Sequence, residues 1–492
     1  MRPILLTHSY FLRFDPKEFR AMMPYPPLGT LYAASYLRTL GFDVALHDTM
    51  LCRREEDISG SLMKFRPSVV VIYDDSFNYL TKMCLSRMRE AAFSMTRLAR
   101  QFGCTVIVFS SDATDHVEDY IRHGANYVIC GEAELTLGEL VTHLVGTPPS
   151  SSLHDIPGIA FVEHGVLVKT EKRKVLDNLD ALPFPAWDLV DMKLYRKVWE
   201  EKHGYFSLNL STTRGCPFHC NWCAKPIYGQ VYHARSPERV AEEMKFLKET
   251  VRPDHIWFTD DIFGLKPGWV RGFDEAVNAG DAVISFKCLS RVDLLLQEDT
   301  IRHLKHAGCQ TVWVGAESGS QKILDAMEKG TTVQQIREAT RGLRAAGIRV
   351  GFFLQFGYPG ETKADIEQTM SMVKECMPDE IGVSVSYPLP GTKFYDRVKG
   401  QLSEKQNWIV SQDLDIMFAG TYMPDFYRVL HHIVHKQFSI WRGRREIRNI
   451  FLPSSTPRRQ RVKHLAGMMY HALTLPIEQH KLRTLERIKP EW

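Results

Sequence analysis

Three cysteines on one short stretch constrain this chain more than any other feature of its sequence. Cys216, Cys220 and Cys223 follow a C-x-x-x-C-x-x-C spacing. Three soft thiolates on a short loop can hold three irons of a cubane 4Fe-4S cluster and leave the fourth iron open to a small ligand. The alternative is a structural zinc site with His219 or His233 as the fourth ligand. Zinc sites usually pair two separated ligand arms, and no second arm with that spacing follows, so the pattern favours the cluster.

Further motifs follow the cysteine motif at intervals. They are Trp222 directly before Cys223, Phe-Thr-Asp-Asp at 258–261, Val-Gly-Ala-Glu-Ser-Gly-Ser at 314–320, Gly-Tyr-Pro-Gly-Glu at 357–361 and Leu-Pro-Gly-Thr at 389–392. Together with the cysteine spacing, they resemble the radical S-adenosylmethionine (SAM) superfamily, and in particular its subfamily with an N-terminal cobalamin-binding domain. Each later motif is weak alone, whereas the combination is highly specific. The resemblance covers about residues 1–400.

Length and composition indicate an ordinary globular protein. At 492 residues, with 44% hydrophobic and 24% charged residues, the chain is too long for one core, and about two or three domains are expected. The net charge of +4 gives no argument for nucleic-acid binding. Of the ten cysteines, only the motif trio is closely spaced, which is not a disulfide framework. We find no signal peptide and no stretch of membrane-spanning length, so we expect a reducing cytoplasm.

Residues 1–150 alternate short apolar runs with helical patterns, which is typical of a parallel, doubly wound α/β sheet. The expected strands are residues 3–6, 44–46, 69–73, 106–109 and 127–130. Ligands of such sheets bind beyond the carboxyl ends of the strands. The polar residues at these ends are Asp48, Asp74, Asp75, Ser76, Ser110 and Ser111.

The resemblance implies that this first domain binds cobalamin. Pro-Pro-Leu-Gly at 26–29 and Cys-Gly-Glu-Ala-Glu at 130–134 are similar to the cobalamin-binding half of the family, which places Gly131 and Glu132 near the corrin or its tail. The chain departs from the family because it has no D-x-H-x-x-G motif to supply a histidine to cobalt, and His8 has no matching context. We therefore expect cobalamin without a histidine on its lower face. A domain that has lost cobalamin is the alternative.

A proline-rich linker at residues 151–195, with a small hairpin around 158–170, is expected to precede a partial (β/α)6 radical SAM barrel at 196–400. The barrel strands are expected near residues 205–213, 255–259, 283–289, 311–316, 349–356 and 381–386. Active groups of barrels gather at the carboxyl ends of the strands, and each motif falls at such an end.

The resemblance assigns SAM contacts to the ends of three barrel strands. The residues concerned are Asp260, Asp261, Ser290, Arg291, Glu317 and Ser318. A carboxylate of Asp260 or Asp261 would face the amino group of SAM, and the planar fork of Arg291 would pair with its carboxylate. Glu317 and Ser318 would contact the ribose or the carboxylate. No catalytic residue is assigned beyond the cluster and the SAM site.

Residues 401–492 are expected to form a helical C-terminal region that packs against the barrel. Its apolar stripe consists of Leu430, Val434, Phe438 and Trp441. The region is rich in arginine, which predicts a solvated surface, an anionic substrate or contact with a membrane face.

The resemblance implies an enzyme that reduces its cluster, cleaves SAM to a 5′-deoxyadenosyl radical and transfers methyl from methylcobalamin to an unactivated carbon. One alternative is a radical oxidative cyclisation or rearrangement without methyl transfer, as in the related anaerobic magnesium-protoporphyrin ester cyclase. Another is a non-catalytic iron–sulfur or zinc protein. The expected partners are a small-molecule substrate, which the sequence does not identify, and an electron donor such as flavodoxin or ferredoxin.

Overall fold

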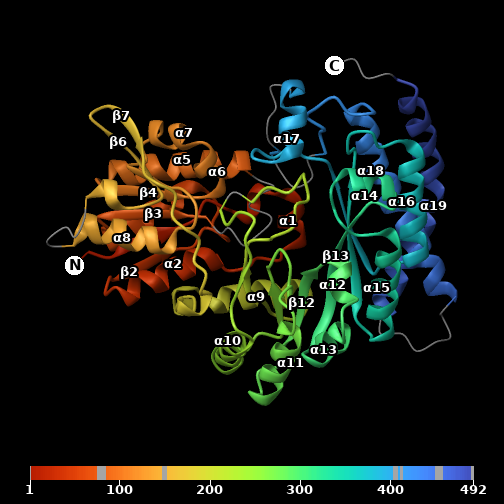
Figure 1. Ribbon diagram of the computed structural model, residues 1–492, viewed down its shortest axis with the longest axis horizontal. Coiled ribbons are helices and arrows are strands. Elements are labelled where there is room, and N and C mark those ends of the chain that lie inside the picture. The colour runs from red at the N-terminus through yellow and green to blue at the C-terminus, as the bar shows by residue number, and fades with distance from the viewer. Residues whose placement is uncertain are drawn as a thin grey trace.

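Two largely parallel sheets, each covered by helices, form the body of the protein (Figure 1). The structure is a computed structural model, and it describes residues 2–74, 85–146, 152–225, 227–402, 408–409, 414–448 and 458–488. A seven-stranded sheet precedes a six-stranded sheet along the chain, and helices follow. The predicted α/β class, with a partial barrel and a helical C-terminal region, is confirmed.

The first sheet has the strand order β2-β1-β3-β4-β5-β6-β7. Its strands are β1 (Ile4–Thr7), β2 (Val44–His47), β3 (Val69–Tyr73), β4 (Thr105–Phe109), β5 (Tyr127–Ile129), β6 (Ile159–Glu163) and β7 (Val166–Lys169). The first five are parallel, and the β6–β7 hairpin, close to the one predicted at 158–170, extends the sheet in antiparallel fashion. The strand order reverses between β1 and β3, where doubly wound sheets open a crevice for ligands.

Helices cover both faces of this sheet. They are α2 (Leu28–Thr39), α3 (Ile58–Phe65), α5 (Leu85–Gln101), α6 (Ser111–Asp115), α7 (Val117–Arg122) and α8 (Glu134–Val145). Alternate residues of β3 enter two different cores, Val69 and Val71 with α2 and α8, and Val70 and Ile72 with α3 and α5. Because both faces are buried, the strands read as continuous apolar runs instead of alternating ones.

The second sheet is parallel throughout, in the order β15-β14-β13-β12-β11-β8. Its strands are β8 (Ser207–Leu210), β11 (His255–Phe258), β12 (Ser285–Ser290), β13 (Cys309–Glu317), β14 (Arg349–Phe356) and β15 (Glu380–Val385). Its helices are α10 (Pro237–Thr250), α11 (Trp269–Ala279), α12 (Val292–Leu295), α13 (Thr300–His306), α14 (Gln321–Ala326), α15 (Val333–Ala345) and α16 (Lys363–Cys376). Six strands in sequential order form a half-barrel whose carboxyl ends share one rim.

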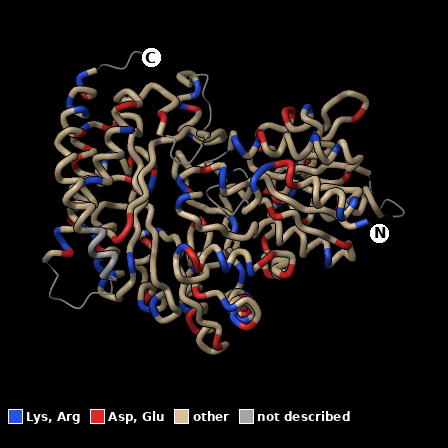
Figure 2. The backbone as a smooth tube through the Cα atoms, turned by 180° about the vertical axis from the view of Figure 1, so that it is seen from behind, with Lys and Arg blue, Asp and Glu red and all other residues tan. Residues whose placement is uncertain are grey.

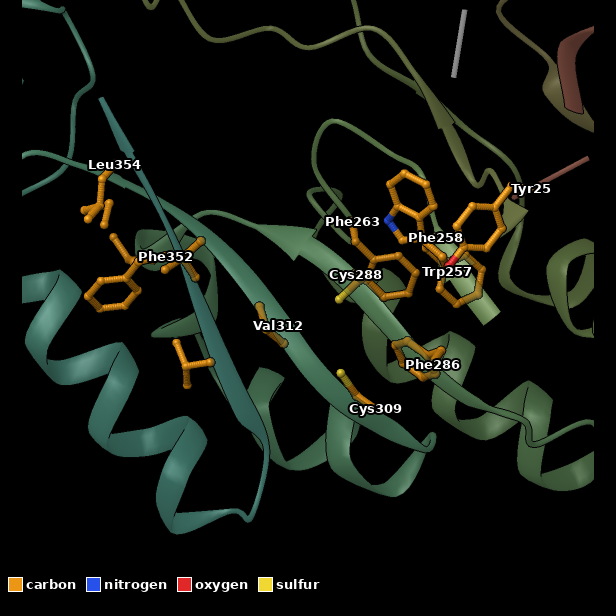
Figure 3. Close-up of a cluster of buried hydrophobic side chains, with 14 of the residues drawn as sticks. Tyr25, Trp257, Phe258, Phe263, Phe286, Cys288, Cys309, Val312, Phe352 and Leu354 are labelled. Carbon is orange, nitrogen blue, oxygen red and sulfur yellow. The ribbon is translucent and has the colours of Figure 1, made fainter. Parts of the chain in front are cut away.

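An aromatic core fixes the helices on the outside of the half-barrel (Figure 3). Phe258, Phe263, Phe273 and Phe286 pack against one another with ring centroids 4.9 to 5.9 Å apart. Side chains alternate along a strand, so Phe286 faces this core while the next residue, Lys287, faces the barrel interior beside Trp257. The strands are thereby held in a fixed register, which sets where their carboxyl ends lie.

Three helices complete the C-terminal region: α17 (Lys393–Val398), α18 (Pro424–Arg448) and α19 (Arg458–Glu486). Helices α18 and α19 form an antiparallel pair that packs beside α16 at the side of the barrel away from the first sheet (Figure 1). The predicted stripe is buried at Leu430, Val434 and Phe438. Lys, Arg, Asp and Glu are interspersed over both sheets, in keeping with the small net charge (Figure 2).

The two sheets are joined by segments from both sides. The segment after β1 contains α1 (Pro16–Ala21) and packs against α9 (Met192–His203) and the barrel. Trp199 donates its indole hydrogen to the Pro24 carbonyl over 2.7 Å, and Asn209 of β8 donates to the Pro26 carbonyl over 3.0 Å. Within the described ranges, no helix is both long and apolar enough to span a bilayer.

Candidate functional site

The three motif cysteines line one cavity of about 260 Å³ at the carboxyl ends of the barrel strands. They lie on the loop between β9 (Thr213–Arg214) and β10 (His233–Ala234), a short antiparallel pair that closes the base of the loop. Gly215 begins the loop with φ of +79°, and a Cβ at this position would meet the Val231 carbonyl oxygen at 2.2 Å. The loop therefore leaves β9 through a turn that requires glycine.

Four of the residues predicted to contact SAM lie in the same cavity wall as the cysteines. They are Asp261, Ser290, Arg291 and Glu317. Apolar and aromatic side chains make most of the remaining wall, and they are Phe218, Trp222, Ile262, Leu289, Trp313, Phe353 and Leu389. Residues that are remote in sequence thus converge on one space, as the family resemblance implies for a cluster with SAM beside it.

The donor set fits an iron–sulfur cluster that binds SAM. Cys216 is buried, and burial raises the pKa of its thiol, so a metal or a nearby cation is needed to hold the thiolate. His219 is exposed, and neither it nor His233 lines the cavity, so the zinc alternative gains no fourth ligand from them here. Among the described residues, no group of three His, Cys, Asp or Glu side chains is arranged to hold a single metal ion.

The guanidinium of Arg291 is held at the cavity wall from three sides. It donates to the Asp293 carboxylate over 3.0 and 3.1 Å and to the Lys329 carbonyl over 3.1 Å. Its central carbon also lies 3.6 Å from the ring centroid of Phe218, on the cluster loop. Such restraint pre-organises a planar cation next to the cysteines, as recognition of a ligand carboxylate requires.

Glu317 shares the cavity wall with a lysine that sequence reasoning missed. Lys329 donates to the Glu317 carboxylate over 2.9 Å, and both side chains are buried. Burial disfavours the charge of Lys329, but Glu317 and Cys220 outweigh it and raise the lysine pKa. Glu317 itself adopts a positive φ of 55° at the end of β13, where the register with β14 shifts. This strained backbone aims the carboxylate at the cavity, where Lys329 pairs with it.

The structure separates the two adjacent aspartates that sequence reasoning left as alternatives. Asp260 is buried away from the cavity and accepts hydrogen bonds from the backbone amides of Thr212 and Thr213 over 2.7 and 2.9 Å and from two hydroxyls. Burial raises its pKa to about 6, although these donors oppose the shift. Asp260 thus shapes the turn between β8 and β9, and Asp261 is the carboxylate that lines the cavity.

Ser318 also lies outside the cavity wall. It is fully buried, shares a 3.1 Å hydrogen bond with Thr369 of α16, and accepts from the amide of Ser320. Its observed contacts fix the turn after β13. Of the pair predicted at this strand end, Glu317 is therefore the residue placed to meet a ligand.

The turn of Gly131 and Glu132 joins the two sheets. The carboxylate of Glu132 accepts from Arg214 and from the amide of Leu176, and Glu134 accepts from Arg214 over 2.6 Å. All three charged side chains are buried. Gly131 has φ of 91°, which lets the chain turn sharply after β5. This turn thus reaches the strand that leads into Cys216, and its predicted contact with the corrin remains a prediction.

The carboxyl edge of the first sheet carries fixed polar groups. His8 is buried and lies 3.0 Å from the Asp48 carboxylate, and Thr49 hydrogen-bonds to the same ring. Asp74 accepts from the amide and hydroxyl of Ser9 over 2.6 and 2.9 Å. The predicted edge residues Asp75 and Ser76 lie outside the described residues. Because its ring nitrogens are engaged by Asp48 and Thr49, His8 is poorly placed to bind cobalt.

This chain is similar in sequence to known proteins. Residues 210–373 match the family model of the radical SAM superfamily. An uncharacterized methyltransferase of Pyrococcus horikoshii is 29% identical over 391 residues, which are 78% of this chain and 81% of the relative. Hopanoid C-3 methylase of Methylococcus capsulatus is 25% identical over 454 residues, 90% and 81% of the two chains.

Two further proteins are similar to this chain, one in sequence and one in fold. Anaerobic magnesium-protoporphyrin IX monomethyl ester cyclase of Synechocystis sp. is 25% identical over 409 residues, 81% of this chain and 78% of the relative. The cobalamin-dependent SAM radical enzyme OxsB, solved with aqua-cobalamin and SAM bound, superposes with a TM-score of 0.72 at 17% identity and covers 96% of this chain and 72% of its own. The match to OxsB shows that both sheets share one fold with it.

Proposed function

We propose that this chain, which belongs to the radical SAM superfamily, cleaves SAM with a 4Fe-4S cluster and uses cobalamin to methylate an unactivated carbon. The observation that carries the proposal is the convergence of the three motif cysteines with Asp261, Arg291 and Glu317 in one cavity. These groups come from four separate segments, and a structural metal site would not need the additional charged residues.

The residues that line the cavity would have separate roles. Cys216, Cys220 and Cys223 would hold the cluster, which when bound supplies the electron for SAM cleavage. Arg291 offers a planar fork for the carboxylate of SAM, and Asp261 offers a carboxylate for its amino group. Most of the remaining wall is apolar, and apolar surroundings strengthen these charged contacts.

Several observations support cobalamin in the first sheet. The sheet has the strand-order reversal at which doubly wound folds bind ligands, and its β5 turn contacts the strand before Cys216. The relatives include proteins named as methylases, and OxsB contains aqua-cobalamin. A methyl donor next to the radical site favours methyl transfer, because a substrate radical that waits for diffusion is quenched.

We also propose the domain boundaries, the electron donor, the cellular location and the class of substrate. We assign residues 1–150 to the cobalamin-binding domain, 151–195 to the linker, whose β6–β7 hairpin extends the first sheet, 196–400 to the barrel and 401–492 to the helical region. A one-electron donor such as flavodoxin or ferredoxin would reduce the cluster, and a reducing cytoplasm would preserve it. The substrate is a small molecule.

The test uses SAM labelled in its methyl group. Anaerobically reconstituted protein with a strong reductant should convert SAM to 5′-deoxyadenosine, and Cys223→Ala should abolish this reaction. Supplied with cobalamin and a small-molecule extract of cells that lack the protein, the enzyme should also produce S-adenosylhomocysteine and a labelled product. Lys393→Met, which changes an exposed ion pair with Glu328, is the matched control and should retain both activities.

The two alternatives predict different results. If 5′-deoxyadenosine and labelled methionine accumulate in step with consumption of a substrate while neither S-adenosylhomocysteine nor a labelled product forms, methylation is wrong and oxidation or rearrangement takes its place. If the protein binds zinc in place of iron and does not cleave SAM, the catalytic proposal itself fails.

A further inference from the structure

Helix α19 exposes a stripe of large apolar side chains to solvent. The exposed fractions are 64% for Met469, 63% for Tyr470, 79% for Leu473 and 71% for Ile477. Met469, Leu473 and Ile477 are spaced four residues apart and Tyr470 lies beside them, so all four occupy one helical face. Single exposed apolar residues are ordinary on protein surfaces, whereas four on one helical face indicate an interaction site.

The stripe lies on a helix that the rest of the protein holds in place. Leu482 and Leu485 of α19 pack against the main hydrophobic core. Glu478 accepts from Lys436 of α18 over 3.3 Å, and Glu486 accepts from Lys363 of α16 over 2.9 Å. The part of α19 that directly follows the stripe is therefore anchored through one face, and α18 packs along the helix, so the stripe points away from the protein as a fixed surface.

Positive charge accompanies the stripe. Residues 421–492 contain fourteen Lys and Arg against five Asp and Glu, a net charge of +9, whereas the remaining 420 residues have a net charge of −5. The exposed basic residues that the structure describes on α18 and on or directly after α19 are Arg428, Arg444, Lys481, Arg483 and Arg487, of which Arg428 is paired with Asp415 and Asp425. Figure 2 shows this helical pair at the edge of the molecule, where its outer side is open.

We propose that α19 docks the protein on the surface of a bilayer that contains anionic phospholipids. The stripe of Met469, Tyr470, Leu473 and Ile477 enters the boundary between headgroups and acyl chains, and the flanking Lys and Arg side chains contact phosphates. An apolar helical face bordered by basic residues is the pattern of helices that lie in a membrane interface. The helix lies on the bilayer and does not cross it.

The charge distribution favours a bilayer over a second copy of this chain. A symmetric dimer through α19 would bring two regions of net charge +9 together, and like charges across an interface are unfavourable. An anionic surface neutralises the same charges. The inference depends only on α19 and its neighbours, so it stands or fails independently of the reaction.

The experiment measures binding of the full-length protein to vesicles by flotation. One vesicle is phosphatidylcholine alone, and the other is phosphatidylcholine mixed with phosphatidylglycerol. The wild type should bind the anionic vesicle. The double variant Leu473→Glu with Ile477→Glu should bind at least about tenfold more weakly, because two large side chains lose their apolar environment. Met63→Glu, at a 61% exposed site on α3, is the matched control and should bind as the wild type does.

A charge variant separates the two parts of the interaction. Lys481→Glu with Arg483→Glu should weaken binding to the anionic vesicle by at least about fivefold for each residue and leave the weak binding to neutral vesicles nearly unchanged. All four substituted side chains are exposed, so the melting temperature should stay at the wild-type value.

Two results would overturn the inference. The first is a wild-type protein that stays unbound with both vesicles, or a Leu473→Glu, Ile477→Glu variant that binds as tightly as the wild type. The second is light scattering that shows a wild-type dimer which the stripe variant converts to a monomer, with vesicle binding absent in both. The second result would assign the stripe to self-association.

Discussion

Replacement of Lys329 by methionine should destabilise the barrel through a single buried charge. Lys329 Nζ lies 2.9 Å from a Glu317 oxygen, and the two side chains are 10% and 6% exposed. At that distance and an effective dielectric constant of about 20, the attraction is about 6 kcal/mol, which desolvation partly offsets. Removal of one partner leaves the other carboxylate buried alone, which costs about 3–5 kcal/mol. We therefore expect Lys329→Met to lower the melting temperature by roughly 6–20 °C.

The assay is thermal unfolding of the cluster-free protein, followed by circular dichroism under anaerobic conditions. Lys393→Met is the control, because its ion pair with Glu328 is exposed and should contribute no more than about 1 kcal/mol. The double variant Lys329→Met with Glu317→Gln should regain most of the lost stability, since it leaves no uncompensated charge. The double variant should nevertheless bind SAM more weakly than the wild type does, because the Glu317 carboxylate is absent.

Equal destabilisation by Lys329→Met and Lys393→Met would refute the reasoning. So would a double variant less stable than Lys329→Met alone, since that result would mean that the glutamate is stabilised by groups other than the lysine. Either outcome would show that Lys329 does not stabilise the Glu317 carboxylate at the cavity wall.

Three further predictions follow from the same structure. Replacement of any motif cysteine by alanine should reduce reconstituted iron from about four per chain to near zero, whereas Cys52→Ala should retain it. Burial raises the pKa of Glu361 to about 8 from 4.5, so the protonated form stabilises the fold; stability should fall by about 1.4 kcal/mol per unit as the pH rises between these values, and Glu361→Gln should remove this dependence in urea unfolding. The paramagnetic spectrum of bound cobalt(II) cobalamin should lack nitrogen splitting from the protein, and His8→Ala should leave the spectrum unchanged; splitting that disappears in this variant would contradict the assignment.

Local sequence signals were sufficient for the sheets and for the cluster loop. The strands of the first sheet are short apolar runs because helices cover both of its faces, and periodicity reveals this property of neighbouring residues. The cysteine spacing is likewise local, and the loop glycine Gly215 is adjacent to it. The rim of the barrel follows from topology, because parallel strands present their carboxyl ends on one side.

The sequence could not distinguish between neighbours with the same chemistry. Asp260 and Asp261 are adjacent carboxylates at one strand end, and which of them faces the cavity depends on donors from Thr212 and Thr213, nearly fifty residues earlier. Nothing in the sequence indicated that Lys329 belongs to the site, because this residue lies outside every motif. Only its contact with Glu317 identifies it as a site residue. Such assignments need tertiary contacts, which a single sequence does not contain.

The contact between Arg214 and the two glutamates explains why both sheets matter to one site. Arg214 stands two residues before Cys216, while Glu132 and Glu134 follow β5 of the first sheet. A buried group of ion pairs of this kind adds little net stability. Separation of its members would leave an uncompensated buried charge, so the two sheets can pack in few other arrangements. It therefore fixes the cluster loop against the carboxyl edge at which a ligand of the first sheet would lie. A methyl donor held at that edge would then lie next to a radical formed in the cavity. Methylation requires this proximity, whereas cleavage of SAM alone does not.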